Sequence, residues 1–310
     1  MRILVIKLGA LGDFVQAMGP AAAIRAHHAG AEITLLTTAP YAELARDAPY
    51  FDRVLIDARP RPFDLAGWWR LRRMLRGERF DRVYDLQTSD RSSLYHWLMG
   101  RPPWSGIARG ASFPHGNPQR DRMHTLDRQA EQLQRAGITA VPPPDLGWAA
   151  RDIARFALPA RLLLLVPGGS AHRPRKRWPI ENFAALAVIA ARLGVTPVVL
   201  GGAQERPLGA AIRAACSAAR DLTGDTDFGE IVGLARAARH AVGNDTGPMH
   251  LIAAAGGSAS VLYSAASDPA LTAPRGAGIT VLRRPVLSTL LPEEVFATLP
   301  EAIRNAAEKP

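Results

Sequence analysis

Short apolar runs typical of buried strands alternate with helical segments along nearly the whole chain of 310 residues. The first half shows strand-like runs at 2–8, 32–38 and 80–87, with helical segments at 14–29 and 40–48 and a basic helix ahead of the third run. This βαβα order predicts a parallel sheet with helices on both of its faces.

The alternation is interrupted once and then resumes. Between 100 and 122 the chain is dominated by Pro, Gly, Arg and Ser, and a proline-rich connection at 140–148 follows a helical segment at 123–137. Strand-like runs then return at 161–170, 195–202, 239–246, 258–264 and 279–284. The sequence therefore predicts two α/β halves with a seam near 150–160.

Composition excludes several classes of protein. No apolar stretch approaches the roughly 18 residues that a membrane-spanning helix needs, so we expect a soluble or peripheral protein. The first apolar run is short and is followed at once by Lys7, which favours a strand over a signal sequence. A single cysteine, Cys216, excludes an internal disulfide framework and fits a reducing compartment, so we expect a cytoplasmic protein.

The formal charge of +10 predicts anionic partners: nucleic acid, acidic lipid head groups or phosphorylated substrates. The segment 59–82 holds eight arginines against three acidic residues, with Trp68 and Trp69 among them. Tryptophan beside arginine on a helix suits a bilayer interface, whereas the alternative is a solvated arginine face with both tryptophans packed inward. Nucleic acid is disfavoured because no recognised binding motif is present.

The turns that follow the predicted strands are the candidate sites, since ligands of open parallel sheets bind at the carboxyl ends of the strands. The first turn runs from Gly9 to Gly12 and enters a helix predicted to start near Phe14. Asp13 stands at this helix start, where a carboxylate is often only a cap.

Two further turns lie in the second half. In the turn at 166–179, Gly168 and Gly169 let backbone N–H groups approach a ligand, and Lys176 supplies positive charge. It is not a Walker loop, because no Gly-Lys-Ser/Thr follows. In the next turn, Glu205 lies where an acidic residue could reach a ribose hydroxyl of a ligand. The alternative is a solvated glutamate in the first turn of a helix, where the helix dipole favours a negative charge.

The most informative turn opens an alanine-rich helix in the second half. Thr246 and Gly247 present hydroxyl and backbone donors at the positive helix end, which suits a pyrophosphate, and His250 adds a hydrogen-bonding group. The alternative is a core helix capped by Asp245 or Thr246. Together with Lys176 from a separate turn, the anion-site interpretation is favoured.

The acidic triplet Asp225-Thr226-Asp227 has the spacing that holds a divalent metal against a nucleotide diphosphate in one class of glycosyltransferases. The same residues suit the cap of a helix at 228–238, and no further carboxylate or histidine cluster follows them. We favour the cap and expect no metal site. Zinc spacing and a Gly-x-Ser-x-Gly elbow are also missing from the sequence.

Six motifs in order resemble glycosyltransferase family 9, the ADP-heptose:lipopolysaccharide heptosyltransferases, over nearly the whole chain. They are the N-terminal strand with Gly-Ala-Leu-Gly-Asp, DLQTSDRSS at 85–93, KRWPIENFAALA at 176–187, VVLGGAQE at 198–205, VGNDTGPMHLIAAAGG at 242–257 and SDPALTAP at 267–274.

The resemblance implies a GT-B architecture of two Rossmann-like parallel-sheet domains that face a cleft. We expect an acceptor-binding domain at 1–155 and a nucleotide-sugar domain at 156–310, with the last helix free to pack back on the first domain. The implied activity is inverting, metal-independent transfer of a heptose from ADP-heptose to a lipopolysaccharide inner-core acceptor. The resemblance further implies a phosphorylated glycolipid acceptor and peripheral contact with the inner face of the inner membrane. It implies no cofactor.

The resemblance also implies roles for individual residues. Asp13 is the implied general base. The implied donor-site residues are Lys176, Thr246 and Gly247 at the diphosphate, Glu205 and Asp245 at the nucleoside or sugar, and Gly168, Ser170 and His250 as neighbours. The implied acceptor-site residues are Gly12, Gln87 and Arg91. The alternatives are a sugar-nucleotide epimerase, a transferase that uses a UDP- or GDP-sugar, and, least favoured, a non-catalytic nucleic-acid-binding protein.

Overall fold

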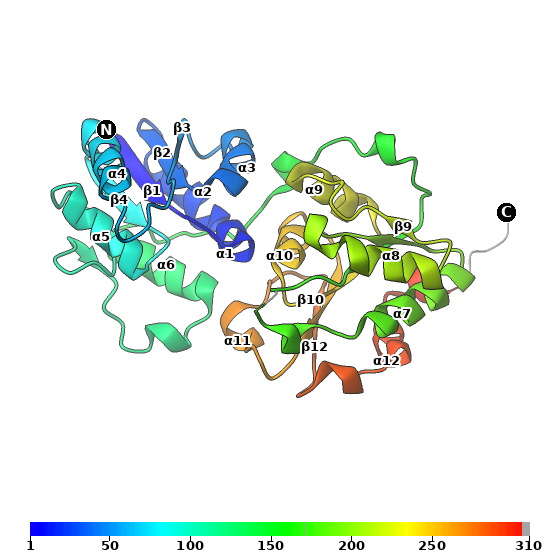
Figure 1. Ribbon diagram of the computed structural model, residues 1–310. Helices are drawn as coiled ribbons and strands as arrows, with labels where there is room; N and C mark the ends of the chain where they lie inside the picture. The colour runs from blue at the N-terminus through cyan, green and yellow to red at the C-terminus, as the bar shows by residue number, and fades with distance from the viewer. Residues whose placement is uncertain (171, 306–310) are drawn as a thin grey trace. The chain divides into compact units, whose positions relative to one another are not determined.

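The computed structural model describes residues 1–170 and 172–305, and the chain divides into two compact units, Met1–Pro144 and Asp145–Pro310. Each unit is built on its own six-stranded sheet, and all paired strands run parallel (Figure 1). The prediction of two α/β halves is confirmed.

The first unit has the strand order β3-β2-β1-β4-β5-β6. Its central strand β1 is buried on both faces, which is why its sequence is a continuous apolar run. The strands are β1 (Arg2–Ile6), β2 (Glu32–Thr37), β3 (Arg53–Ile56), β4 (Arg82–Asp85), β5 (Trp104–Gly106) and β6 (Phe113–Pro114). The helices are α1 (Leu11–Gln16), α2 (Met18–His27), α3 (Ala42–Asp47), α4 (Leu65–Gly77), α5 (Asp90–Leu98) and α6 (Thr125–Arg135).

The second unit has the strand order β12-β11-β10-β7-β8-β9. The strands are β7 (Leu162–Val166), β8 (Thr196–Val199), β9 (Arg220–Asp221), β10 (His240–Asn244), β11 (Ala259–Tyr263) and β12 (Ile279–Arg283). The helices are α7 (Ile180–Arg192), α8 (Arg206–Ala215), α9 (Phe228–Ala237), α10 (Gly247–Ala254), α11 (Pro269–Thr272), α12 (Pro292–Ala297) and α13 (Glu301–Arg304). Helix α7 contacts α8 and α12, whereas α9 contacts α10 (Figure 1).

Each sheet has one point at which the strand order reverses. This topological switch lies between β1 and β4 in the first unit and between β7 and β10 in the second. Helices that leave the two neighbouring strands on opposite faces open a crevice there, and ligands of doubly wound sheets bind in it. Asp13 lies in the first turn of the helix after β1, and the turns that carry Gly168 and Asp245 follow β7 and β10, so all three residues lie at switch points.

Several elements differ from the sequence-based expectations. Strands β3, β5, β6 and β9 were not predicted, and each has only two to four residues. The helix expected at 14–29 is two helices, α1 and α2, which are separated at Ala17. Because α1 begins at Leu11, Gly12 lies inside its first turn and not in the preceding loop, which corrects the expected turn from Gly9 to Gly12.

The boundary between the units lies at 144/145, eleven residues before the expected 155/156. The segment after Pro144 bonds to the second unit: Leu146 N–H donates to the Ala254 carbonyl at 2.8 Å, and Arg151 N–H donates to the Gly229 carbonyl at 3.1 Å. Backbone bonding to the ends of α10 and α9, which composition does not reveal, therefore fixes this boundary.

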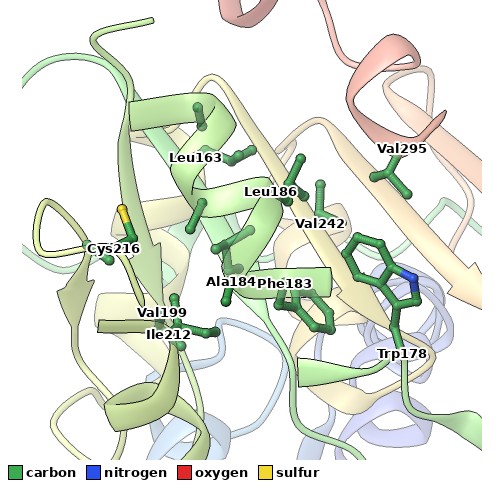
Figure 2. Packing of buried hydrophobic residues seen from close by; sticks show 14 of the residues in the cluster. Leu163, Trp178, Phe183, Ala184, Leu186, Val199, Ile212, Cys216, Val242 and Val295 are labelled. Carbon is green, nitrogen blue, oxygen red and sulfur yellow. The ribbon is translucent and has the colours of Figure 1, made fainter. Parts of the chain in front are cut away.

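The hydrophobic core of the second unit includes residues near the end of the chain. Trp178 and Phe183 meet edge to face at 4.8 Å, with Leu186, Val242 and Val295 around them (Figure 2). Ile303 of α13 is fully buried in the same cluster. Up to Asn305, the last helix thus packs on the core of the second unit; residues 306–310 lie outside the described part.

Candidate functional site

Asn244 joins the carboxyl ends of β7 and β10 at the switch point of the second unit. Its side chain is fully buried, and its amide donates to the carbonyls of Pro167 and Gly168 at 2.8 and 3.1 Å. Its carbonyl oxygen accepts from the Trp178 N–H at 2.9 Å. One amide therefore fixes both the glycine turn after β7 and the segment that carries Lys176. Asn244 was not among the residues predicted from the sequence, although an amide at the end of a buried strand is the signal for such a role.

Lys176 and Asp245 form a close, mostly buried ion pair beside this amide. The Lys176 ammonium donates to Asp245 Oδ2 at 2.5 Å, and the two side chains are 12% and 8% exposed. Burial by itself raises the pKa of the Asp245 carboxyl, but the hydrogen bond and charge of Lys176 outweigh it and hold the pKa below its usual value. The structure thus brings together two residues that are 69 positions apart.

Two hydroxyls complete the surroundings of Asp245. Those of Tyr263 and Ser267 lie close enough to lower its pKa further, although in the described part of the chain neither oxygen has a hydrogen bond of ordinary geometry. Burial and then the Asp245 charge raise the pKa of Tyr263. The carboxylate therefore has one strong partner, Lys176, and two weak ones.

Lys176 is held in place through Trp178, two residues further along the chain. The indole is 2% exposed, donates from Nε1 to the Leu290 carbonyl at 2.9 Å, and packs against Phe183 (Figure 2). Since the Trp178 backbone is bonded to Asn244, the ammonium is attached at close range to the core. Such preorganisation is what electrostatic stabilisation of a developing charge requires.

Helix α10 begins directly after Asp245. Thr246 is its N-cap residue and makes no capping hydrogen bond with its side chain, and Asp245 is bonded to Lys176. Of the two residues interpreted as possible caps, Thr246 therefore occupies the N-cap position but makes no side-chain capping bond, whereas Asp245 is not the cap. Gly247 is the first helical residue, and His250 is 7% exposed within the helix.

The turns after β7 and β8 meet at Glu205. Its Oε2 accepts from the Gly202 N–H at 2.9 Å, and a Cβ on Gly168 would lie 2.8 Å from Glu205 Cγ. Gly168 is therefore required for close approach of the two turns. Ser170 is exposed, and its carbonyl accepts from the Arg173 N–H. Glu205 is part of a hydrogen-bonded turn at the edge of the switch point.

The acidic triplet is a helix cap, as favoured. Asp227 Oδ1 accepts from the Glu230 N–H at 2.8 Å, and Glu230 Oε2 accepts from the Asp227 N–H at 3.0 Å, which is a capping box. Arg151 pairs with Asp227 Oδ2 at 2.6 Å. Within residues 1–170 and 172–305, no group of three His, Cys, Asp or Glu side chains could hold a metal ion.

Asp13 occupies the third position of α1, at the switch point of the first unit. The N-cap is Ala10, which has no side-chain capping bond, so the interpretation of Asp13 as the cap is wrong. The carboxylate is half-buried, and its charge, second to burial, raises the pKa of Tyr41. Gly9 has a φ of +118°, and a Cβ there would meet the Tyr41 ring at 2.5 Å, so only glycine fits.

Gln87 and Arg91, two of the predicted acceptor residues, form contacts within the first unit. Gln87 Oε1 accepts from the Leu8 N–H at 2.9 Å, which fixes the turn before Asp13. Arg91 donates to the Tyr95 hydroxyl at 2.6 Å and to the Pro60 carbonyl at 3.3 Å. Both side chains thus position loops at the carboxyl ends of β1 and β3.

Three basic side chains that were not selected from the sequence lie near one another at this switch point, and one of them, Lys7, lies near Asp13. Lys7 is buried and donates to the Leu86 carbonyl at 3.0 Å; burial lowers its pKa, the charges of Asp13 and Asp85 oppose that shift, and those of Arg128 and Arg120 add to it. Burial and the charge of Arg128 likewise lower the pKa of Arg120. The only sequence signal was a lysine directly after an apolar strand. We call Lys7, Arg120 and Arg128 the basic cluster.

Asp85 is the buried acid within this cluster. Burial raises its pKa to about 6, although N–H donors from Thr88 and Gln87 and the charge of Lys7 favour the ionised form. Arg120 reaches the same loop and donates to Thr88 Oγ1 at 2.6 Å. The half-buried carboxylate of Asp13 near Lys7, together with the arginines around Lys7, gives this switch point both a proton acceptor and affinity for anions.

Replacing Asn244 by alanine is expected to cost about 3 kcal/mol of unfolding free energy, because three hydrogen bonds of a buried group are lost at once. The affinity for ADP should fall with it, since the Lys176 segment loses its attachment. Urea titration followed by circular dichroism, with calorimetric ADP titration, measures both. Asn182→Ala, which removes one bond to the Leu290 carbonyl, is the control and should cost about 1 kcal/mol with unchanged ADP affinity. Equal losses in both variants would contradict the role of Asn244.

Comparison with known proteins assigns the family. The model of glycosyltransferase family 9 (heptosyltransferase) matches residues 68–288. Lipopolysaccharide heptosyltransferase 2 of Escherichia coli K12 is 26% identical, over 91% of this chain and 88% of that protein.

Two solved structures share the fold. The E. coli ADP-heptose LPS heptosyltransferase II has a TM-score of 0.81 at 23% identity, over 95% of this chain and 96% of its own. E. coli heptosyltransferase WaaC with ADP-2-deoxy-2-fluoro heptose has a TM-score of 0.75 at 20% identity, over 95% of this chain and 98% of that chain. The fold is thus GT-B-like, with two Rossmann-like units, and the chain belongs to glycosyltransferase family 9, the heptosyltransferases.

Proposed function

We propose that this glycosyltransferase moves a heptose from ADP-heptose to a lipopolysaccharide inner-core acceptor, with inversion at the anomeric carbon and without a metal ion. The observation that carries the proposal is the Lys176–Asp245 pair at the start of α10, on the β7/β10 switch point of a family 9 chain. The names of the relatives support the donor and acceptor: one is a lipopolysaccharide heptosyltransferase, and another was solved with an ADP-heptose analogue.

The second unit would bind the donor. Lys176, Thr246 and Gly247 contact the diphosphate, because an ammonium and a helix N-terminus both favour negative charge. Glu205, which packs against Gly168, and Asp245, which pairs with Lys176, would contact the nucleoside or the sugar. Gly168, Ser170 and His250 complete the proposed donor site. No cofactor takes part, since the nucleotide-sugar is itself the substrate.

The chemistry is a displacement at the anomeric carbon. The acceptor hydroxyl oxygen forms a bond to that carbon while the bond to the diphosphate oxygen breaks, and its electron pair leaves with ADP. Asp13 takes the proton of the attacking hydroxyl. Lys176 and the α10 N-terminus stabilise the negative charge that grows on the departing diphosphate, the task that a metal ion performs in other transferases.

The first unit would bind a phosphorylated glycolipid acceptor. The basic cluster supplies the positive charge at the switch point that carries Asp13. Gly12, Gln87 and Arg91 form the remaining acceptor contacts in this proposal. Such an acceptor is a membrane lipid, so we place the enzyme in the cytoplasm as a peripheral protein on the inner face of the inner membrane. In the described part of the chain, no helix has the length and apolarity to cross a bilayer.

Release of ADP from ADP-heptose tests the proposal when it depends on heptose-deficient lipopolysaccharide dissolved in detergent. We expect release that persists in EDTA, a product of inverted anomeric configuration by NMR, and no turnover of UDP- or GDP-sugars. Preferred turnover of a UDP- or GDP-sugar, or epimerisation without transfer, would replace the proposal with one of those activities. Salt-sensitive binding of duplex DNA in preference to ADP would contradict it.

A further inference from the structure

Exposed hydrophobic and basic side chains gather on one surface of the first unit. Five of the ten large hydrophobic side chains that are exposed in the described chain come from residues 63–69, just before and at the start of α4, and from α5. We call this surface the α4–α5 face; its members are Phe63, Leu65, Trp69, Arg72, Arg73, Arg76, Leu94, Trp97 and Arg101.

Helical spacing explains how α4 presents this face. Leu65, Trp69, Arg72 and Arg76 follow at intervals of four, three and four residues, so they share one side of the helix. The opposite side is buried through Gly67, Leu71 and Leu75. One helix thus packs on the core and presents a stripe that changes from apolar to basic along its length.

The two tryptophans of α4 separate the alternatives left open by the sequence. Trp68 packs against the core, donates from Nε1 to the Arg61 carbonyl at 2.9 Å, and lies under the Arg91 guanidinium. Trp69 is 57% exposed, with Arg73 over its ring at 5.4 Å. The inward-packed interpretation is therefore right for Trp68 and wrong for Trp69.

A pocket of about 250 Å³ lies between the two helices of this face. It is lined by Arg72 and Arg76 from α4, and by Trp97, Gly100 and Arg101 at the end of α5. The Arg76 guanidinium lies over Gly100, where a Cβ would approach it to 3.0 Å; the φ of Gly100 is +84°. The pocket therefore gathers three guanidinium groups and one exposed indole, which is 62% accessible.

These three arginines have no carboxylate partner among residues 1–170 and 172–305. Elsewhere in the same unit, Arg53 pairs with Glu78 and Glu32, and Arg25 pairs with Asp52. Three unpaired guanidinium groups around one pocket repel each other, and a phosphate group would remove that repulsion through bidentate hydrogen bonds.

We propose that the α4–α5 face docks on an anionic phospholipid bilayer, with a lipid phosphate in the pocket of Arg72, Arg76 and Arg101 and with Trp69 and Trp97 at the level of the head groups. The proposal rests on the peripheral membrane association proposed above and names the surface responsible. Phosphate alone explains the arginines, whereas the exposed side chains of Phe63 (96%) and Leu65 (79%), close to Trp69 in sequence, favour a partner with apolar depth. A bilayer interface offers both.

Sedimentation with phosphatidylcholine vesicles, with and without phosphatidylglycerol, tests this assignment on the full chain. R72Q/R76Q/R101Q should bind phosphatidylglycerol vesicles on the order of 100-fold more weakly than wild type, since each basic residue near an anionic surface contributes roughly fivefold. W69A/W97A should bind more weakly while its salt dependence persists. The control R192Q/R213Q/R239Q removes the same charge from exposed positions of the second unit and should stay within about threefold of wild type.

The possible outcomes distinguish this inference from the proposed peripheral membrane association on which it rests. If the control and the pocket variant lose vesicle binding equally, or if the pocket variant binds like wild type, the α4–α5 face is not the docking surface, although the proposed membrane association stands. Failure of wild type to bind phosphatidylglycerol vesicles would overturn both. Release from the vesicles by stoichiometric heptose-deficient lipopolysaccharide would assign the face to the acceptor and overturn it as a bilayer contact. ADP release in detergent should be unchanged in all variants, which also shows that they fold.

Discussion

Asp13→Ala is expected to lower the turnover number by about 10²- to 10⁴-fold, the usual contribution of a general base, while ADP binds as in wild type. The expectation rests on position. Asp13 is half-buried in the first turn of α1, on the β1/β4 switch point, and is not the N-cap of that helix, which is Ala10. The residues proposed for ADP all belong to the second unit, so donor affinity should not depend on this carboxylate.

Two further variants distinguish a base from a structural acid. Asp13→Asn keeps the shape of the side chain but cannot take a proton, so it should be as inactive as Asp13→Ala. Asp90→Ala removes an exposed acid from the first turn of α5, after the neighbouring strand β4, and should retain turnover. Steady-state kinetics of ADP release, with calorimetric ADP titration, measures each. An Asp13→Asn enzyme with near wild-type turnover would remove Asp13 from this role.

The parts of the fold that follow local rules could be predicted from the sequence. Buried parallel strands such as β1 and β7 are continuous apolar runs, and glycine-rich turns follow them because close approach or a positive φ requires glycine, as at Gly9. The short strands β5 and β6 have no such signal. They exist only because a neighbouring strand supplies hydrogen-bond partners.

The candidate site likewise has features that could be predicted from the sequence and features that could not. Lys176 and Asp245 were each selected from their own turns, but their 2.5 Å contact depends on Asn244 and Trp178, which join segments far apart in sequence. The basic cluster likewise comes from the residue after β1, the turn at Arg120–Arg122 and α6, and no local pattern relates Lys7 to Arg128. Local chemistry therefore identified candidate residues, whereas tertiary contacts decide which of them act together.

The ion pair of the second unit makes stability depend on pH. Because the folded pKa of Asp245 lies below its usual 3.8, the stabilisation is present above that value and is lost as the pH falls through the folded pKa. Without Lys176, burial is the largest remaining influence and raises the pKa of Asp245. A Lys176→Ala protein should then become less stable as the pH rises through that raised pKa, opposite in sign to wild type.

Lys176→Ala is expected to weaken ADP-heptose binding by about 10- to 100-fold, the contribution of a hydrogen bond to a charged group. Turnover should fall by a further 10²- to 10³-fold or so, because charge on the leaving diphosphate grows in the transition state. Calorimetric titration and single-turnover kinetics measure the two losses separately.

A double-mutant cycle with Asp245→Asn decides what Lys176 does. If the lysine only neutralised a buried carboxylate, removing both charges in K176A/D245N would restore ADP affinity, because no unpaired charge would remain. If the ammonium binds the diphosphate, the double variant stays as weak as Lys176→Ala. We expect the second result: the pair stands at the start of α10 beside the cap residue Thr246, where an incoming diphosphate competes with Asp245 for the same ammonium. Restored affinity in the double variant would reduce Lys176 to a structural partner of Asp245.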